Sequence, residues 1–315
     1  MGSQPDDNAI NDGSGNVYHV PVLLKEAVAA MNIQPSGIYV DCTFGGGGHS
    51  ALILQQLDPD GRLYVFDQDA DARKNVPEDP RIIFIPHNFR HLQRFLRLNK
   101  VQEVHGILAD LGVSSHQFDD PARGFSTRFD SDLDMRMDTR QDLTAYKVVS
   151  SYSEEQLHKI FEQYGEVTNS KTLAKTIVAV RNTVSLRTID NFKNALHGIV
   201  KGNPNKYFAQ VFQALRIEVN DELGALKELL EQLPRVLMKG GHAVIITFHS
   251  LEDRLVKNFF RKGSFEDAED TNPFINTISE AELKPVTKKP VVAGSEEIKI
   301  NPRARSAKMR VAEKI

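Results

Sequence analysis

The sequence predicts an α/β fold with a mostly parallel sheet, interrupted by an all-helical insertion. Short apolar runs alternate with helical patterns through the first third of the chain, and a glycine-rich loop follows the first run. Strands that alternate with helices pair in parallel, and nearly continuous apolar runs indicate strands buried on both faces. The alternation stops after Asp110 and the sheet pattern returns at Gly241. One sheet domain is therefore expected on either side of a helical insertion.

Apolar runs define the strands of this sheet. Leu63–Phe66 and Ile82–Ile85 are unbroken apolar segments, as expected for strands covered on both faces. The predicted strands are Gly37–Asp41, Arg62–Asp67, Arg81–Pro86, Val104–Asp110, Gly241–Phe248 and Ala307–Ala312. The stretch 263–297 is rich in proline, lysine and acids and is expected to be an excursion before the last strand.

Helical patterns with capping residues fill the insertion. Ser153 and Gln156 have the spacing of a capping box, in which side chain and backbone bond reciprocally. A long helical pattern ends near Leu233, and Pro234 is expected to kink or break it. The predicted helices are Ser153 to Gln163, Lys171–Asn182 capped by Ser170, Ile189–Val200 capped by Thr188, and about Lys206 to Leu233. Residues 18–113 and 205–315 are assigned to the sheet domain, residues 114–204 to the insertion, and the polar residues 1–17 to a disordered N-terminus.

Composition indicates a cytoplasmic globular protein. Hydrophobic residues make up 40% of the 315 residues and charged residues 26%, which is typical of soluble domains. No apolar run is long enough to span a bilayer, and the N-terminus lacks a signal-peptide pattern. Cys42 is the only cysteine, so no intramolecular disulfide can form, and a reducing compartment is expected. No Cys/His cluster has zinc spacing, so no metal site is predicted.

Charge is distributed unevenly along the chain. The net charge is −3, which does not by itself indicate a nucleic-acid-binding protein. Between Gln156 and Lys206, however, basic residues outnumber the acids Glu162, Glu166 and Asp190. A local basic face can hold phosphates even on an acidic protein. Solvated helix faces explain the same charges equally well.

The segment 37–50 is the most informative one. A short apolar strand is followed by an acid, four consecutive glycines and the start of a helix. A glycine loop between a parallel strand and a helix is where doubly wound sheets bind nucleotide-like cofactors. Asp41, just before Gly45 and Gly47, would repel a pyrophosphate but suits the cationic end of S-adenosylmethionine. An ordinary glycine turn is the alternative.

Polar residues also follow the other predicted strands, where an open α/β sheet binds its ligands. Asp67 can accept both ribose hydroxyls of an adenosine, Phe89 can stack on an adenine, and Asp110 is expected beside the reacting centre. After the fifth strand, His249 could act as a base or donate to a backbone carbonyl, while Ser250 has the character of a helix N-cap. Each single residue has a structural alternative as a cap or loop hydrogen-bonder.

Three further motifs combine charged and aromatic residues. The alternating charges of Asp134–Asp138 can pair with one another and brace a domain junction. Arg123 and Phe125 could offer a phosphate clamp and a stacking ring, and Arg303 and Arg305 could hold phosphates bidentately. Stability and binding explain each of these three motifs equally well.

These motifs together resemble the MraW/RsmH family, bacterial S-adenosylmethionine-dependent methyltransferases that act on N4 of a cytosine in 16S ribosomal RNA. The resemblance covers the chain from Tyr18 to Arg310. It depends on six ordered motifs at residues 41–50, 110–117, 123–126, 134–138, 248–254 and 301–306. His105 is a departure, because the family usually has Asp there, at the start of the fourth strand and far from the expected ligand edge.

The resemblance implies a class I (Rossmann-like) methyltransferase domain with an inserted substrate-recognition domain. It implies S-adenosyl-L-methionine as cofactor and a decoding-centre cytosine of 16S ribosomal RNA, in the small ribosomal subunit, as target. No membrane contact is expected, and a homodimer stays open. The family's cofactor-binding positions correspond to Gly47, Gly48, His49, Asp67, Phe89, Asp110 and Gln117.

The N4 amine of cytosine is a poor nucleophile because its lone pair is conjugated with the ring. Hydrogen-bond acceptors that hold the amine in line with the methyl group would lower the barrier, and Asp110 is the first candidate, with His249 second. The base must first be unstacked. The residues expected to contact the RNA are Arg123, Phe125, Ser250, Arg254, Arg303 and Arg305. C5 methylation would need a cysteine nucleophile, and Cys42 lies at the cofactor strand instead.

Two other functions remain as alternatives. An NAD-dependent oxidoreductase is disfavoured because Ser50 stands at the third glycine position of that fingerprint and Asp41 precedes the loop. A non-catalytic RNA-binding or assembly factor with a retained cofactor fold is less well supported, since polar residues are present at every strand end. Only an activity assay separates it from an enzyme.

Overall fold

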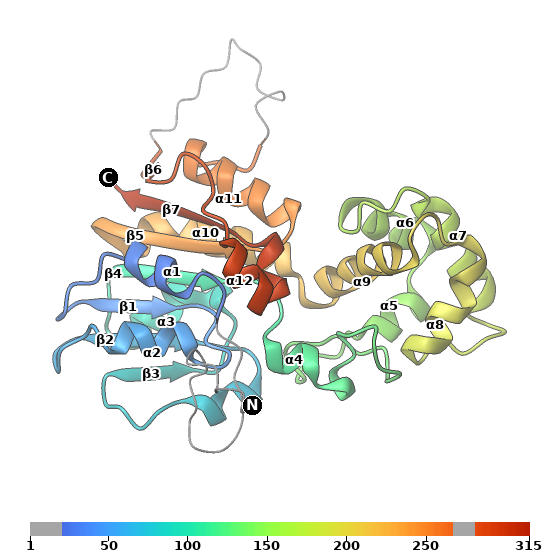
Figure 1. Ribbon diagram of the computed structural model, residues 1–315, viewed down its shortest axis with the longest axis horizontal. Coiled ribbons are helices and arrows are strands. Elements are labelled where there is room, and N and C mark those ends of the chain that lie inside the picture. Colours follow the sequence, from blue (N-terminus) through green and yellow to red (C-terminus); the bar gives the residue numbers. More distant parts are fainter. Residues whose placement is uncertain (1–20, 267–280) are drawn as a thin grey trace, which may run out of the picture. The chain divides into compact units, whose positions relative to one another are not determined.

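The computed structural model describes residues 21–266 and 281–315, so the expected disordered segment 1–17 lies outside the described residues. The chain divides into two compact units (Figure 1). The first contains the chain up to Gly112 and from Ala225 onward, and the second is Val113–Gly224. The second unit therefore extends past the boundary expected at residue 204, because the helix that follows packs into its core.

A seven-stranded sheet of order β3-β2-β1-β4-β5-β7-β6 forms the centre of the first unit. Strands β1 to β5 pair in parallel, and β7 runs antiparallel to both β5 and β6. The predicted α/β fold with a mostly parallel sheet is confirmed. The strands are β1 Ile38–Asp41, β2 Arg62–Phe66, β3 Ile82–Ile85, β4 Val104–Asp110, β5 Leu237–Thr247, β6 Leu283–Pro285 and β7 Lys308–Lys314.

The strand order reverses between β1 and β4. From β1 the chain moves outward through β2 to β3, then returns to place β4 on the other side of β1. Such a switch point opens a crevice beyond the carboxyl ends of the two strands. Asp41 ends β1 and Asp110 ends β4, so both carboxylates belong to this edge.

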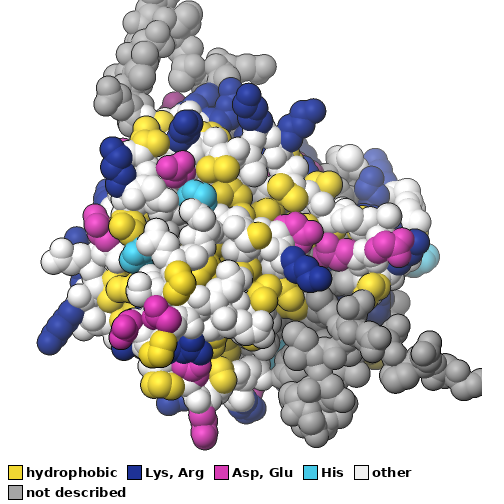
Figure 2. Space-filling model, turned by 60° about the vertical axis from the view of Figure 1, so that its left-hand side comes forward, with side chains coloured by type: hydrophobic (Ala, Val, Ile, Leu, Met, Phe, Trp, Pro, Cys, Tyr) yellow, Lys and Arg dark blue, Asp and Glu magenta, His cyan; other side chains and the backbone are white. Residues whose placement is uncertain are grey.

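Helices cover both faces of the sheet, and successive strand residues face opposite cores. Tyr39 and Leu108 pack with α1 and α2, whereas Val40 and Ile107 pack with α3, α10 and α11. This alternation follows from the two-residue period of a strand. The helices outside the insertion are α1 Leu24–Ala30, α2 Gly48–Leu54, α3 Leu92–Leu98, α10 Glu222–Val236, α11 Ser250–Lys262 and α12 Ser295–Ile300. On the face drawn in Figure 2, basic and acidic side chains are interspersed with apolar ones.

The second unit is helical, with its own core around Phe161, Phe192 and Leu215. The capping box of Ser153 and Gln156 is confirmed, as is the cap by Thr188. Its helices are α4 Ser115–Asp119, α5 Ala145–Ser151, α6 Glu154–Gln163, α7 Ser170–Val180, α8 Ile189–Leu196 and α9 Pro204–Asn220. None of the helices within residues 21–266 and 281–315 has both the length and the apolar character needed to cross a membrane.

Several helix boundaries differ from prediction, including that of α8, which ends at Leu196 instead of Val200. Two of the differences have a clear structural cause. Ser170 is the first residue of α7 rather than its cap, because Asn169 occupies the N-cap position and Ser170 donates its N–H to the Val167 carbonyl. The long helix breaks at Asp221, whose φ of 46° is left-handed, and not at Pro234, which lies inside α10. Left-handed backbone ends a helix wherever it occurs, and the sequence offered no glycine to mark this position.

Candidate active site

The glycine loop between β1 and α2 has backbone angles and close contacts that favour residues without a side chain. Gly45 and Gly47 have φ angles of 51° and 78°, and Gly47 is the N-cap of α2. A Cβ atom on Gly48 would lie 2.2 Å from Cγ of Pro21. Left-handed backbone favours glycine, and close packing excludes a Cβ. The predicted close turn at this strand end is therefore present.

Asp41 is only 1% exposed and holds the glycine loop through its side-chain hydrogen bonds. One carboxylate oxygen accepts the N–H of Thr43 at 3.0 Å, and the other accepts the hydroxyl of Ser50 at 2.7 Å. Burial raises the pKa of Asp41, and these hydrogen bonds oppose that rise. Asp41 therefore braces the turn rather than facing a ligand. The same bond explains Ser50, which stands where a dinucleotide fingerprint has glycine.

Two side chains that follow β2 bind the backbone N–H and the backbone carbonyl of Gly45. Asp67 accepts the Gly45 N–H at 2.8 Å and the Asp69 N–H at 2.8 Å, while Asn75 donates to the Gly45 carbonyl at 2.9 Å. Burial raises the pKa of Asp67 to about 6. Each carboxylate oxygen has a second lone pair, so Asp67 can hold the loop and still accept from a ligand.

Asp110 is the least satisfied carboxylate of this edge. Its N–H donates to the Thr43 hydroxyl at 2.7 Å, and its side chain is 22% exposed. Its Oδ1 atom is buried and has no hydrogen-bond partner among the described residues. Burial raises the pKa of Asp110 well above its usual range, and the carboxylates of Asp41, Glu252 and Glu297 raise it further. A cation bound here would relieve this unfavourable charge.

His49 lies beside Asp110 and is itself buried. Its Nε2 atom is 3.2 Å from the Val22 carbonyl oxygen, and its Nδ1 atom is 3.9 Å from Oδ2 of Asp110. Burial lowers the pKa of His49 to about 4, so the ring is neutral at pH 7. The Val22 carbonyl can only accept, so the proton of the neutral ring lies on Nε2. Nδ1 is then unprotonated, and at 3.9 Å it is too far from Oδ2 of Asp110 for a hydrogen bond.

Glu297, for which the sequence predicts no role, also belongs to the charge cluster around Asp110. Its Oε1 atom accepts the N–H of Leu23 at 2.7 Å, where the backbone is left-handed with φ of 53°. This contact ties α12 to the start of α1. No local signal marks it, because Glu297 and Leu23 lie at opposite ends of the chain.

His249 caps α11, so the expectation that Ser250 is the cap is wrong. His249 has extended backbone, and its Nδ1 atom accepts the Glu252 N–H at 3.5 Å. Glu252 reaches back to accept the Phe248 N–H at 2.8 Å, and its Oε1 atom lies 3.2 Å from Nε2 of His249. Nδ1 is thus held by the cap, whereas the buried Nε2 atom lies near Glu252 without a hydrogen-bond partner among the described residues. Ser250 is exposed, as is Arg254.

The other residues assigned to the first unit differ in exposure. Arg303 and Arg305 lie in the short 3-10 helix Pro302–Ser306, where Arg305 is exposed and Arg303 is half-buried. Phe89 begins another short 3-10 helix and packs partly against the core. His105 accepts the Ile38 N–H at 3.0 Å at the start of β4, away from the carboxyl edge, as predicted.

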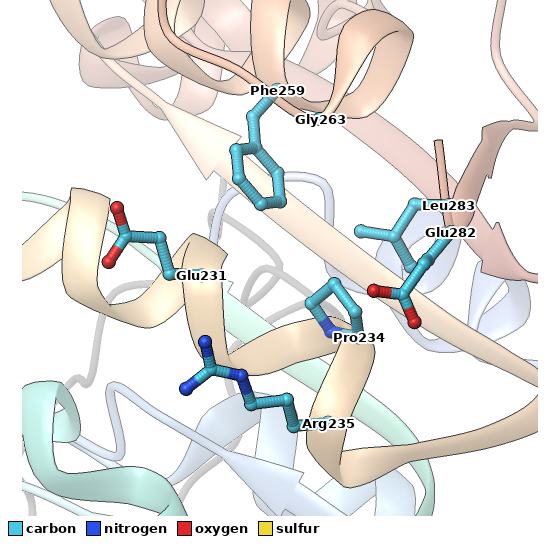
Figure 3. A pocket seen from close by; sticks show the side chains of 7 residues that line it. All are labelled: Glu231, Pro234, Arg235, Phe259, Gly263, Glu282 and Leu283. Carbon is cyan, nitrogen blue, oxygen red and sulfur yellow. The ribbon is translucent and has the colours of Figure 1, made fainter. Parts of the chain in front are cut away.

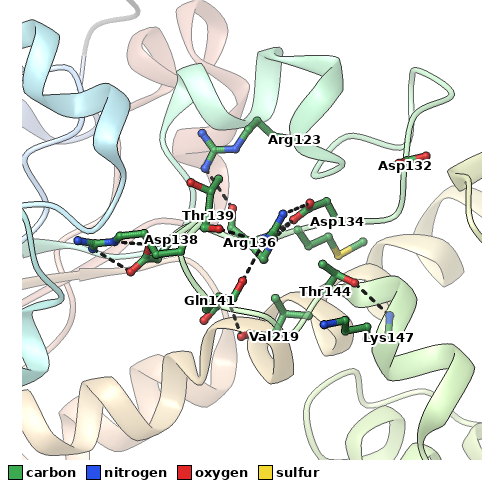
Figure 4. A network of polar contacts seen from close by, with 12 residues as sticks. Arg123, Asp132, Asp134, Arg136, Asp138, Thr139, Gln141, Thr144, Lys147 and Val219 are labelled. Atoms are coloured by element: carbon green, nitrogen blue, oxygen red, sulfur yellow. Dashed lines mark hydrogen bonds and ion pairs between the residues drawn. The ribbon is translucent and has the colours of Figure 1, made fainter.

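Three predicted site residues belong to the second unit and have structural roles there. Arg123 is buried and donates to the carbonyls of Arg136 and Met137 at 3.0 and 3.1 Å (Figure 4). Phe125 is buried in the core, and Gln117 closes a capping box with Ser114. The hypotheses of a phosphate clamp at Arg123 and a stacking ring at Phe125 are therefore wrong, because neither side chain is available at the surface.

The charged loop near Arg123 pairs internally, as expected. Arg136 binds Asp134 at 2.8 Å and Arg140 binds Asp138 at 2.7 Å. Met135, between Asp134 and Arg136, has a φ angle of 63°. The side-chain oxygen of Asn220 accepts the Met137 N–H at 2.7 Å. These contacts hold the loop in one conformation within the second unit.

A pocket of about 300 Å³ in the first unit lies elsewhere (Figure 3). Its lining comes from the C-terminal ends of α10 and α11 and the start of β6, including Arg235, Phe259 and Leu283. Since α10 leads directly into β5, this pocket lies at the amino end of that strand. It contains none of the predicted site residues, so the carboxyl edge is identified by its side chains rather than by cavity volume.

The model of the MraW methylase family matches residues 16–315. The chain belongs to this family. The small-subunit ribosomal RNA methyltransferase H of Parabacteroides distasonis is 53% identical over 95% of this chain and 98% of its own. The protein of the same name from Phocaeicola vulgatus is 52% identical over 95% of this chain and 98% of its own. The sheet described above is accordingly the class I, Rossmann-like sheet of a methyltransferase, and the predicted resemblance is confirmed.

Proposed function

We propose that this chain transfers a methyl group from S-adenosyl-L-methionine to the exocyclic N4 of a cytosine in the decoding centre of 16S ribosomal RNA. Membership of a methylase family supports methyl transfer, and the names of the relatives support small-subunit ribosomal RNA as substrate. The observation that carries the proposal is Asp110, whose buried and unpaired Oδ1 atom lies at the switch point of the sheet.

The residues at this edge fit S-adenosylmethionine. The cofactor carries a sulfonium and an ammonium group, and the edge supplies the acids Asp67, Asp110 and Glu297. None of these three accepts a hydrogen bond from a Lys or Arg side chain among the described residues. An anionic pyrophosphate would meet the same acids unfavourably. Asp67 would accept from the ribose, the glycines would let backbone approach the ligand, and Phe89 would lie against the adenine.

Bound S-adenosylmethionine supplies an electrophilic methyl group. The protein's part is to hold the cytosine amine in line and to accept its hydrogen bonds, which makes the nitrogen more nucleophilic. Asp110 is suited to this role because a nearby cation lowers the pKa of a carboxyl and keeps it ionised. His249 remains the second candidate, since its Nδ1 atom caps α11 and only the buried Nε2 atom has no hydrogen-bond partner among the described residues.

Methylation of carbon C5 is not supported. That reaction needs a thiolate nucleophile, and Cys42 is 2% exposed within the core. Burial raises the pKa of the Cys42 thiol well above its usual range, and the charge of Asp41 raises it further. A buried, protonated thiol cannot attack a base.

The test is transfer of radiolabelled methyl groups from S-adenosylmethionine to small ribosomal subunits from cells that lack this gene, followed by nucleoside analysis. Label in N4-methylcytidine supports the proposal. Asp110→Ala is expected to abolish transfer, whereas Cys42→Ser should retain it. Label in 5-methylcytidine, or an Asp110→Ala variant with wild-type turnover, would refute the assignment. Cofactor binding without any transfer would favour the RNA-binding or assembly factor.

A further inference from the structure

One part of the second unit carries positive charge with few acids nearby. From Val167 to Ile217 the only acid is Asp190. The bases in this stretch are Lys171, Lys175, Arg181, Arg187, Lys193, Lys201, Lys206 and Arg216. A fold does not require such an imbalance, since solvated helix faces usually mix both signs.

The bases divide into two groups by their contacts. Half of them have partners, which are Asp132 for Arg187, Asp190 for Lys193, Glu222 for Arg216 and the Tyr152 carbonyl for Arg181. The remaining four are Lys171, Lys175, Lys201 and Lys206. All four are exposed, and none of them forms an ion pair with an acid among the described residues.

The four unpaired lysines come from three segments that meet at Asn169. The Asn169 side chain donates to the Ile199 carbonyl at 2.9 Å, and it also lies against the hydroxyl of Tyr207. Lys171, Lys201 and Lys206 are each within two residues of one of these three positions. Lys175 is one helical turn beyond Lys171 on the same face of α7.

The local backbone adds to the positive field. The first turn of α7 contains no acid, and the Asn169 side chain makes no cap hydrogen bond to it. Gly198 and Gly202 flank Lys201, and a Cβ atom at either position would meet nothing within 4 Å. This part of the surface is open, and the nearest exposed acid in sequence is Glu166.

We propose that Lys171, Lys175, Lys201 and Lys206, here called the lysine cluster, bind the phosphate backbone of the ribosomal RNA substrate. The inference rests on the proposed function, which supplies the RNA. Lysine presents a flexible point charge that suits phosphates without reading bases. The cluster would thus position the RNA, while selection of the cytosine would occur at the sheet edge.

The test uses the full chain and an unmodified 16S ribosomal RNA transcript as probe. Lys171→Gln/Lys175→Gln, Lys201→Gln/Lys206→Gln and the quadruple variant are compared with wild type by filter binding over a series of KCl concentrations. The slope of log affinity against log salt is expected to fall by about 0.7 to 0.9 for each phosphate that the variant no longer neutralises. The quadruple variant should bind more than about tenfold more weakly at low salt.

Two single-substitution controls each remove one lysine outside the cluster. Lys193→Gln removes a lysine that is paired with Asp190 in the same unit, and Lys239→Gln removes an exposed lysine at the start of β5. Both should keep the wild-type salt slope, and all variants should keep wild-type affinity for S-adenosylmethionine. An unchanged slope in the quadruple variant, with methyl transfer intact in wild type, would overturn the cluster and leave the proposed function standing. A reduced slope without methyl transfer in wild type would support the cluster and refute the enzyme.

Discussion

The Ser50 hydroxyl donates to Oδ2 of Asp41 at 2.7 Å, and both side chains are buried. This bond joins the end of β1 to the first turn of α2 across the glycine loop. It also compensates a carboxylate that burial would otherwise leave poorly solvated. The loop geometry therefore depends on a serine at a position where related nucleotide-binding loops use glycine.

Ser50→Ala should lower the free energy of unfolding by about 1 to 3 kcal/mol, because it removes a donor from a buried carboxylate. Urea denaturation measures the change. Ser151→Ala is the matched control, since the Ser151 hydroxyl is exposed and donates only to the Lys147 carbonyl. Equal effects of the two substitutions would contradict the role of Ser50.

Gly47→Ala should destabilise the protein by about 1 kcal/mol or more, because its φ of 78° is left-handed. Weaker binding of S-adenosylmethionine should accompany the change if the loop approaches the cofactor. Gly198→Ala is the comparison, since its Cβ would enter open space. Thermal unfolding and calorimetric titration report the two effects separately, and a neutral Gly47→Ala would show that the loop tolerates a side chain.

Two buried groups at the site should give opposite pH dependence. The folded pKa of His49, about 4, lies below the value of about 6.5 expected for the unfolded chain. The unfolded state therefore binds more protons between these values, and stability falls as pH decreases through this window. His49→Gln should reduce this acid-induced loss of unfolding free energy by up to about 3 kcal/mol. A wild-type acid sensitivity retained by the variant would show that His49 is not its source.

Asp110 has the opposite effect on how stability depends on pH. Its folded pKa lies well above that of an unfolded aspartate, so the folded state binds more protons and stability falls as pH rises from about 4. Asp110→Asn should therefore be more stable than wild type at neutral pH and similar at pH 4. Saturating S-adenosylmethionine should reduce the difference, because a cation stabilises the wild-type carboxylate. Differential scanning calorimetry with and without cofactor tests both statements, and a variant less stable than wild type at neutral pH would refute them.

The ion pair of Asp253 and Arg310 holds α11 against β7. Burial would raise the pKa of Asp253, but Arg310, at 2.6 Å, and Lys308 outweigh it and lower the pKa. Arg310→Met should cost about 3 to 5 kcal/mol, because it leaves a largely buried charge without its main partner. Arg187→Met, which breaks the exposed pair with Asp132, should cost at most about 1 kcal/mol. Denaturant titration would contradict the assignment if the two costs were alike.

Local patterns were sufficient for much of the fold and for part of the site. The parallel strands were predictable because burial on both faces leaves continuous apolar runs, as at Leu63–Phe66. The Ser153 capping box was predictable because its partners are three residues apart. In each case the deciding interactions lie within one element, or depend on a period that the sequence displays directly.

Long-range contacts decided the rest. The short edge strand β6 pairs only with β7 and contains Pro285, so it has no apolar run to mark it. Arg123 is a residue type that often binds phosphate. Its guanidinium, however, donates to the carbonyls of residues thirteen and fourteen positions away. Glu297 reaches the site only because it accepts from Leu23. No spacing rule connects residues so far apart.

The helical unit is inserted between β4 and β5, which are neighbours in the sheet. Asp110 and Ile246 pair across this junction, so a ribosome must synthesise the whole insertion before the central pairing can form. Closing a long flexible loop is entropically unfavourable and slows folding. The insertion has a separate core around Phe161 and Leu215, so it can become compact first. A compact insertion lowers the entropic cost of bringing its two ends together. The insertion is thus expected to set the order in which the nascent chain acquires its structure.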